Sequence, residues 1–142
     1  VCNKPLGFNS AQTVEQILTY LTGPLGLAPA RLALVGTDRL NDYAPIFEKA
    51  KLDMARQIYL RDDAEALAAA DGSGYFRFPG SPAALVHATV GVYCWIGDGA
   101  PRQLTAYPPS EDWTEIGEVS VDDAVALGFG LGTERLALAT TG

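Results

Sequence analysis

Residues 85–96 read LVHATVGVYCWI, and this stretch decides the fold class. Its β-branched and aromatic residues predict a long strand, and the residues GDG at 97–99 predict a turn after it. Residues 103–107 are predicted to return as the hairpin partner, and 113–121 (WTEIGEVSV) to form a further strand. We therefore expect the second half of the chain to be a mostly antiparallel sheet.

Before this stretch, helical and extended patterns alternate. A helix is predicted to start near Ala11, after a capping Asn9 or Ser10, and to end at Gly23-Pro24. The other predicted elements of this half are strands at 32–35, 57–60 and 75–78, helices over 42–56 and 62–70, and a break at 71–74 (DGSG). With a strand at 125–129 and a helix at 134–139, the expected class is α/β (α+β), an antiparallel β-sheet flanked by helices in a single domain, 1–142.

The composition is that of a folded protein, with 48% hydrophobic and 19% charged residues. The net charge is −7, and the 10 Lys and Arg residues are scattered among acidic ones. A nucleic-acid-binding domain usually gathers its basic residues on one face. We therefore expect no direct nucleic-acid binding by this chain alone.

The two cysteines, Cys2 and Cys94, lie far apart in the sequence and show no zinc-binding spacing. This usage favours two reduced thiols in a cytoplasmic protein, and a disulfide between them stays open. No apolar run reaches the roughly 18 residues of a membrane-spanning helix, and no signal peptide is visible. We expect a cytoplasmic protein with no membrane partner.

Residues 128–139 read GFGLGTERLALA, a strand with alternating glycines that opens into a helix with Arg135 in its first turn. Glycine weakens a strand, and a cation at a helix start is unfavourable by some ~0.3–1 kcal/mol. One interpretation is that a flat ligand approaches the backbone while Arg135 faces an anion. The other is a tight strand–helix crossing in which Arg135 pairs with Glu134 or with solvent.

The segment GFGLGTERLAL resembles motif 3 of class II aminoacyl-tRNA synthetases, especially of the phenylalanyl and pyrrolysyl types. Residues 113–117 (WTEIG) resemble the strand that precedes motif 3 in that family. Residues 21–34 and 57–80 are similar to parts of the alanyl type. The resemblance thus comes in pieces from several subfamilies, and only the motif 3 stretch is specific.

The resemblance implies a class II synthetase-like core that binds ATP and Mg²⁺. In it Arg135 would be the catalytic residue that contacts the γ-phosphate, and Gly130 and Gly132 would lie against adenine. Gly128 would belong to the same binding strand, although the alanyl enzymes carry an Asp at that position.

The resemblance also implies a metal role for Glu115, with Glu118 as a second acid. Several relatives have Glu-x-x-Ser at this place, so the pair Glu115–Glu118 departs from the family pattern.

Motifs 1 and 2 of the family are not visible in the chain, so the expected core is incomplete. The chain is then an ATP- or adenylate-binding domain of an amino-acid-activating ligase. A partner chain supplying motifs 1 and 2, or a homo-oligomer, would complete it. Two alternatives stay open: a catalytically silent paralogue or subunit, and a phage or particle assembly protein. The second rests on 90–99 and 112–121, which are similar to strands of tail-tube proteins.

Overall fold

The structure is a computed structural model that describes residues 2–3, 10–77, 86–121, 127–132, 134, 135, 137 and 140. In chain order the elements are β1 (Cys2–Asn3), α1 (Ser10–Thr22), η1 (Pro29–Arg31), β2 (Leu32–Gly36), η2 (Asp38–Tyr43), α2 (Ala44–Lys49), α3 (Met54–Gln57), β3 (Ile58–Leu60), α4 (Asp63–Ala69), β4 (Tyr75–Arg77), β5 (Val86–Trp95), β6 (Trp113–Ser120) and β7 (Leu127–Leu131), where η marks a 3-10 helix.

One mixed sheet forms the centre of the molecule, in the strand order β1-β7-β6-β5-β2-β3, and β4 pairs with the first part of β5. Only β2 and β3 run parallel among the described pairs; the others are antiparallel. The prediction of a mostly antiparallel sheet with helices is confirmed at this level. The long strand predicted at 85–96 is the hub, because β5 pairs with β2, β4 and β6.

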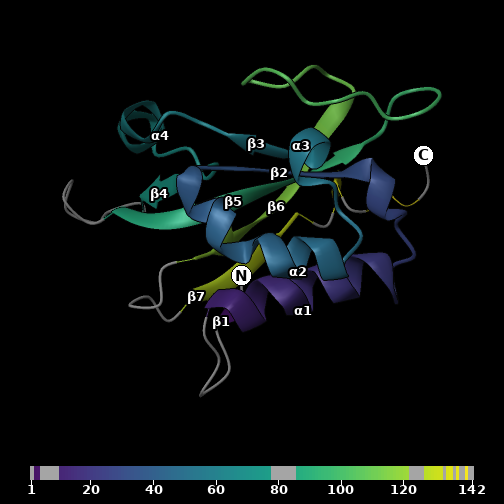
Figure 1. Ribbon diagram of the computed structural model, residues 1–142, viewed down its shortest axis with the longest axis horizontal. Helices are drawn as coiled ribbons and strands as arrows, with labels where there is room; N and C mark the ends of the chain where they lie inside the picture. Colours follow the sequence, from purple (N-terminus) through teal and green to yellow (C-terminus); the bar gives the residue numbers. More distant parts are fainter. Residues whose placement is uncertain are drawn as a thin grey trace.

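Helices α1 and α2 lie together on one side of the sheet (Figure 1). The apolar stripe of α1 is buried, because residues at helical spacing share one face of the helix. It consists of Val14, Ile17, Leu18 and Leu21. As predicted, the helix ends before Gly23, whose amide donates to the Thr19 carbonyl. This face holds the larger hydrophobic core, together with Phe47 of α2.

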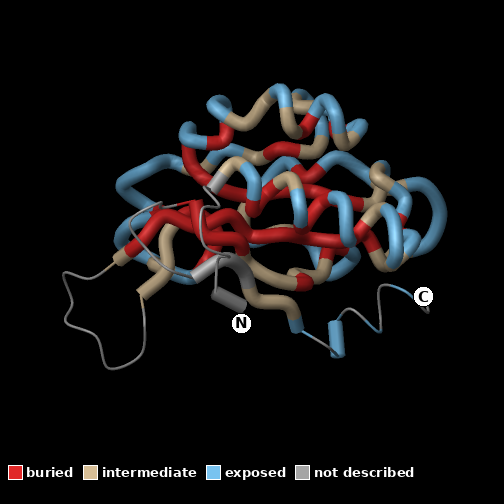
Figure 2. Tube along the Cα trace, turned by 90° about the horizontal axis from the view of Figure 1, so that it is seen from below, coloured by how far each residue is buried: buried red, intermediate tan, exposed pale blue. Residues whose placement is uncertain are grey.

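The other face of the sheet carries a smaller apolar cluster and then polar side chains. Trp95 and Trp113 pack edge to face with ring centroids 5.3 Å apart, and Leu104 covers them from the loop 96–112. The strands in the middle of the molecule are accordingly buried along most of their length (Figure 2). Along β5 the side chains alternate between the two faces, so Val92 and Cys94 face the helices while Tyr93 and Trp95 do not.

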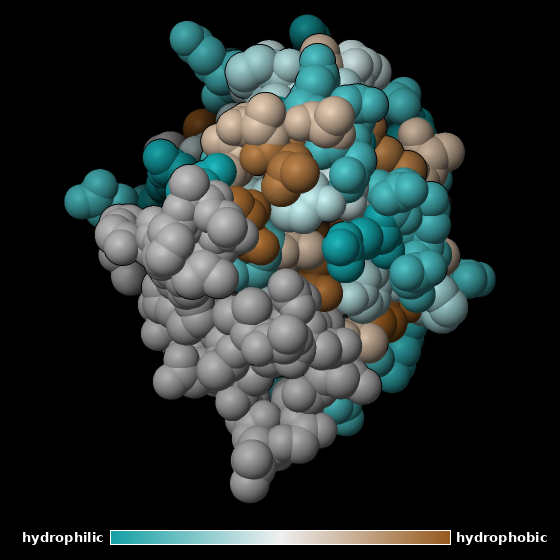
Figure 3. All heavy atoms as spheres, turned by 90° about the vertical axis from the view of Figure 1, so that its left-hand side faces the viewer, coloured by the Kyte–Doolittle hydropathy of each residue, from teal (hydrophilic) through white to brown (hydrophobic). Residues whose placement is uncertain are grey.

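The end of the molecule that carries α4 and β4 has a mixed surface (Figure 3). Hydrophobic residues there lie between hydrophilic ones. Leu67 of α4 is among the exposed large hydrophobic residues. The α4 prediction is confirmed, with Asp62 as the N-cap that accepts a hydrogen bond from the Glu65 amide.

The prediction of a single helix over 42–56 is wrong. The chain forms η2, α2 and α3 there instead, with a turn between α2 and α3. Lys51 adopts a left-handed backbone conformation with φ 65°, which ends the first helix. Asp53 then caps α3 by accepting a hydrogen bond of 2.9 Å from the Ala55 amide.

The predicted hairpin partner at 103–107 is also wrong, since those residues form no strand. The strand that follows β5 in the sheet is β6, reached through the long loop 96–112. Pro101 and Pro108 lie in this loop, and proline cannot donate to a sheet ladder. Leu104 gains its burial by packing over the two tryptophans rather than by pairing with β5.

The glycine-rich segment predicted as a strand is β7, which pairs antiparallel with β6. Of the predicted helix 134–139, residues 134, 135 and 137 are helical, and 136, 138 and 139 lie outside the described residues. Residues 78 and 125–126 of the predicted strands also lie outside them.

Cys94 is a free thiol buried in β5. Among the described helices, none combines the length and the apolar character that crossing a membrane requires.

Candidate functional site

Two carboxylates of β6 reach the same face of the sheet because the strand contains a β-bulge. Glu115 and Gly117 lie opposite neighbouring residues of β5, so Ile116 is an extra residue in β6. In a regular strand, residues three apart point to opposite faces. Here Glu115 and Glu118 share one face, and Ile116 is buried in the core on the other.

These carboxylates line a pocket of about 500 Å³ along β6 and β7. Its walls are residues 115–118 and 130–132, Phe76, Glu134 and Arg135. The structure therefore brings together Glu115, Glu118, Gly130, Gly132 and Arg135, which the resemblance had singled out. Gly128 lies in β7 two residues before Gly130, and hence on the same face of the strand.

Arg135 lines the pocket and contacts Glu115 of β6. Its Nη1 donates to the Glu115 carbonyl at 3.2 Å and lies 3.8 Å from the Glu115 carboxylate. One interpretation of the sequence paired Arg135 with Glu134 or with solvent, but in the structure its partner is Glu115. The Arg135 side chain is 58% exposed, so the pairing is screened by water and the guanidinium stays accessible.

The glycines around the pocket differ in how crowded they are. A Cβ on Gly117 would lie 2.2 Å from the Gly130 carbonyl, so close packing of β6 on β7 demands that glycine. Among the described residues, the nearest atom to a Cβ on Gly132 would belong to Arg135, at 3.8 Å, which is an ordinary contact. Packing against the described residues therefore does not require a glycine at 132, and the absence of a side chain there leaves more of the pocket volume open.

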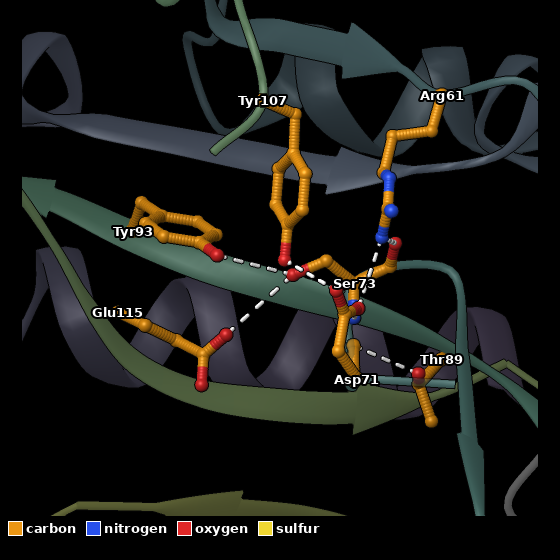
Figure 4. A network of polar contacts seen from close by, with 8 residues as sticks. Arg61, Asp71, Ser73, Thr89, Tyr93, Tyr107 and Glu115 are labelled. Atoms are coloured by element: carbon orange, nitrogen blue, oxygen red, sulfur yellow. Dashed lines mark hydrogen bonds and ion pairs between the residues drawn. The ribbon is translucent and has the colours of Figure 1, made fainter. Parts of the chain in front are cut away.

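Glu115 belongs to a network of polar contacts on the same face of the sheet (Figure 4). Ser73 donates a long hydrogen bond of 3.5 Å to the Glu115 carboxylate, and its Oγ lies 3.1 Å from the hydroxyl of Tyr93. Ser73 is fully buried, and the nearby Thr89 hydroxyl donates to the Gly72 carbonyl at 2.8 Å. These contacts fix residues 71–74 against β5.

The network continues away from the pocket through Asp71 (Figure 4). One carboxylate oxygen of Asp71 accepts from Arg61 at 2.9 Å and the other from the Tyr107 hydroxyl at 2.8 Å. The Arg61 guanidinium also donates to the Ser73 carbonyl at 3.0 Å and stacks 3.9 Å from the Tyr107 ring centroid. Arg61 thereby connects the end of β3, residues 71–74 and the loop 96–112.

Two glycines make room for this network. A Cβ on Gly91 would lie 2.3 Å from the Ser73 hydroxyl, and one on Gly72 would lie 2.2 Å from a carboxylate oxygen of Glu118. Gly72 also has φ +100°, which side chains rarely adopt. Glu118 thus lies directly against the backbone of residues 71–74.

Burial and like charge disfavour the ionised form of both carboxylates. Burial, then the charges of Glu115 and Asp71, raise the pKa of Glu118 to about 7. Burial also raises the pKa of Glu115, while its hydrogen bonds with Tyr93 and Ser73 and the charge of Arg135 lower it. Glu118 makes no hydrogen bond or ion pair with the described residues, so it is the carboxylate that is open to a ligand.

Among the described residues, no group of three or more His, Cys, Asp or Glu side chains is placed to hold a metal ion. Glu115 and Glu118 alone therefore do not form a closed metal site. Mg²⁺, however, commonly binds through one or two carboxylates together with water and substrate phosphates. Glu115 and Glu118 supply two carboxylates of that kind at one pocket.

Sequence reasoning missed Ser73, Tyr93, Tyr107, Asp71 and Arg61 as site residues. It treated residues 71–74 only as a break after a helix, because nothing in a single sequence reports which loop folds back on a sheet. The available signal was Gly91, since a glycine inside a β-branched run marks a close approach of another backbone or ligand.

Neither protein-family models nor curated proteins match this chain. The chemistry available at the pocket is that of its own residues, among them the carboxylates of Glu115, Glu118 and Glu134, the guanidinium of Arg135 and the glycines 117, 130 and 132.

Proposed function

We propose that this pocket binds a nucleoside triphosphate, ATP, with Mg²⁺, as the ATP- or adenylate-binding part of a class II synthetase-like ligase. The observation that carries the proposal is the convergence of Glu115, Glu118, Gly130, Gly132 and Arg135 on one pocket. These residues come from strands β6 and β7 and the helical segment after them, and they are residues that the resemblance assigns to the nucleotide and metal site.

Arg135 would bind the terminal phosphate. Its guanidinium is exposed, and among the described residues Glu115 is its partner, so a phosphate that enters the pocket can replace this contact with stronger, charge-assisted hydrogen bonds. The open floor at Gly132 supports the same proposal, because a flat base can lie where a side chain would otherwise project.

The charges of the pocket favour a nucleotide that carries its metal. Glu115, Glu118 and Glu134 face one described cation, Arg135, so a free triphosphate would be repelled. A bound Mg²⁺ would neutralise phosphate charge and bridge it to the carboxylates. Glu118, without a partner among the described residues, is the better placed of the two acids to accept that bridge.

The chain would bind ATP without completing catalysis by itself. Adenylate formation places negative charge on the α-phosphate, and stabilisation of such charge is usually the largest catalytic contribution. The family supplies it with a motif 2 arginine that is not visible in this sequence. A partner chain with motifs 1 and 2, or a homo-oligomer, would provide the missing groups.

Calorimetric titration with ATP and Mg²⁺ tests the proposal. We expect binding that depends on Mg²⁺ and that falls by about 10-fold or more in Arg135→Ala, the usual consequence of losing a charge-assisted contact. Lys49→Ala is the matched control, because it removes a cation from α2 on the opposite side of the sheet.

An absence of Mg-ATP binding to the folded chain would favour the silent-subunit alternative and refute the proposal. Equal weakening by Arg135→Ala and Lys49→Ala would show a general charge effect, which the proposal does not allow.

A further inference from the structure

The two carboxylate oxygens of Glu115 have different partners. Oε1 lies 3.8 Å from Nη1 of Arg135, which lines the pocket at β6 and β7. Oε2 accepts the long hydrogen bond of 3.5 Å from the Ser73 hydroxyl. The carboxylate is therefore oriented, with one oxygen toward the guanidinium of the pocket and the other toward residues 71–74.

Ser73 is itself fixed through the backbone. Its amide donates to the Asp71 carboxylate at 3.1 Å, and its carbonyl accepts from Arg61 at 3.0 Å. The carbonyl of the next residue, Gly74, accepts from the Thr89 amide at 2.9 Å. The Ser73 side chain is also fully buried, so the position of its hydroxyl is set by the fold and not by solvent.

The Ser73 hydroxyl has one hydrogen to donate, and the hydroxyl of Tyr93 bears on where that hydrogen goes. The two hydroxyl oxygens lie 3.1 Å apart. Burial strongly raises the pKa of Tyr93, so Tyr93 keeps its proton and can donate it to Ser73. The Ser73 hydrogen is then free for Glu115, whose ionised carboxylate can only accept. Figure 4 shows these three side chains in line, with Ser73 between the other two.

We propose that Ser73 is a positioning residue, which binds Oε2 of Glu115 and thereby keeps Oε1 directed at the pocket. The terminal torsion of a glutamate is only weakly restrained, so a partner on one oxygen is what orients the other. The use of this orientation rests on the proposed function, in which Glu115 helps to hold a magnesium ion. The orientation itself is a property of the free chain.

Titration of Mg²⁺ at a fixed ATP concentration tests the role of Ser73. Loss of a hydrogen-bond partner of a metal-ligating carboxylate usually lowers metal affinity by about 10–100-fold. Ser73→Ala should raise the Mg²⁺ concentration for half-maximal ATP binding by about 10-fold, at the lower end because the hydrogen bond is long. Thr89→Val is the matched control and should leave that concentration unchanged. It removes another buried hydroxyl that holds the same segment, but one that donates to the Gly72 carbonyl and not to Glu115.

The orientation of Glu115 is measured separately, in the protein without nucleotide. Carbon NMR of the side-chain carboxyl groups reports it, and Glu115→Gln identifies the resonance by its loss. We expect this resonance to move in Ser73→Ala and to stay in place in Thr89→Val. If the protein binds no Mg-ATP, the proposed function fails, and the carboxyl resonance still decides whether Ser73 positions Glu115.

Circular dichroism checks that the variants are folded. If Ser73→Ala does not fold, Tyr93→Phe takes its place, because it removes the hydroxyl beside Ser73 and keeps the aromatic ring; both measurements should then change in the same direction. Equal effects of Ser73→Ala and Thr89→Val would show that residues 71–74 act only through the fold. An unmoved Glu115 resonance in Ser73→Ala would show that Ser73 does not hold the carboxylate. Either result overturns the proposal.

Discussion

At the scale of single residues, Glu118 is the unusual group of the site. It is half-buried against Gly72, next to two other acids, and has no hydrogen-bond or ion-pair partner among the described residues. Native proteins seldom leave a buried charge unpaired, because its desolvation is not offset. Such a group destabilises the fold whenever it is ionised, and it is available to whatever enters the pocket.

The pH dependence of stability should reveal this carboxyl. Its pKa is raised from 4.5 to about 7, so the folded state holds a proton that the unfolded state has lost, and stability falls as the pH rises through that range. Glu118→Gln should therefore raise the free energy of unfolding at pH 8 by about 1–2 kcal/mol, after allowance for solvent screening. It should have little effect at pH 4. Urea unfolding at both pH values measures this, with the exposed Glu48→Gln as control.

Two glycine substitutions should differ in how much they change the free energy of unfolding. Gly91→Ala should lower the free energy of unfolding by about 1–3 kcal/mol, because its methyl group would collide with Ser73 and press on Tyr93. Gly132→Ala meets only ordinary contacts and should change stability by less than about 0.5 kcal/mol. Thermal unfolding of both variants compares them. A Gly91→Ala protein as stable as Gly132→Ala would contradict the close approach of residues 71–74 to β5.

At the scale of elements, Arg61 joins three segments that are distant in sequence. Its side chain is 8% exposed and binds Asp71, the Ser73 carbonyl and the Tyr107 ring, while its amide donates to the Gly36 carbonyl. Ser73, which donates a hydrogen bond to Glu115, is therefore positioned by the end of β3 as well as by β5 and β6. A lysine cannot replace this planar, two-sided contact.

Arg61→Lys should lower the free energy of unfolding by about 1–3 kcal/mol, because Asp71 and the Ser73 carbonyl lose well-placed donors. Urea unfolding measures the loss. The exposed Arg39→Lys, which keeps the charge at another surface position, serves as control. A loss no larger than that of the control would show that the network does not hold these segments.

How far the sequence predicts these elements depends on whether the signal is local. The helix α1 and the strands β2, β5 and β6 have periodic or β-branched patterns of their own, and their predicted positions agree with the structure within two residues. The prediction of a single helix over 42–56 was wrong because Lys51 has a left-handed backbone conformation that interrupts it. A lysine at that position does not indicate such a conformation. The bulge at Ile116 and the folding back of residues 71–74 depend on tertiary packing, so the shared face of Glu115 and Glu118 could not be read from spacing.

At the scale of the whole molecule, β5 is the central strand, because it connects the sheet, the helical core and the site. It pairs with three other strands, faces the helical core on one side and carries the site on the other. Cys94 lies in this strand with no solvent exposure, and burial raises the pKa of its thiol. A thiol so placed reacts with a labelling reagent only when the sheet opens.

Labelling of Cys94 by a disulfide reagent should therefore report global unfolding. In a Cys2→Ser variant without denaturant, the labelling rate should be slower than that of an unfolded control by a factor that matches the unfolding equilibrium constant. This prediction is checked by comparing the labelling rate with the unfolding equilibrium constant that urea denaturation gives. Rapid labelling of the native protein would mean that β5 opens locally, contrary to its central place.

The extra residue at Ile116 also bears on how this protein can change in evolution. Loss of that one residue would straighten the strand, and the two acids would then lie two positions apart and still face the same way. A homologue can thus keep both acids with either spacing, provided that the bulge appears or disappears with the inserted residue. An alignment that permits a single gap at this point would recover such homologues, whereas a motif of fixed length would pass over them.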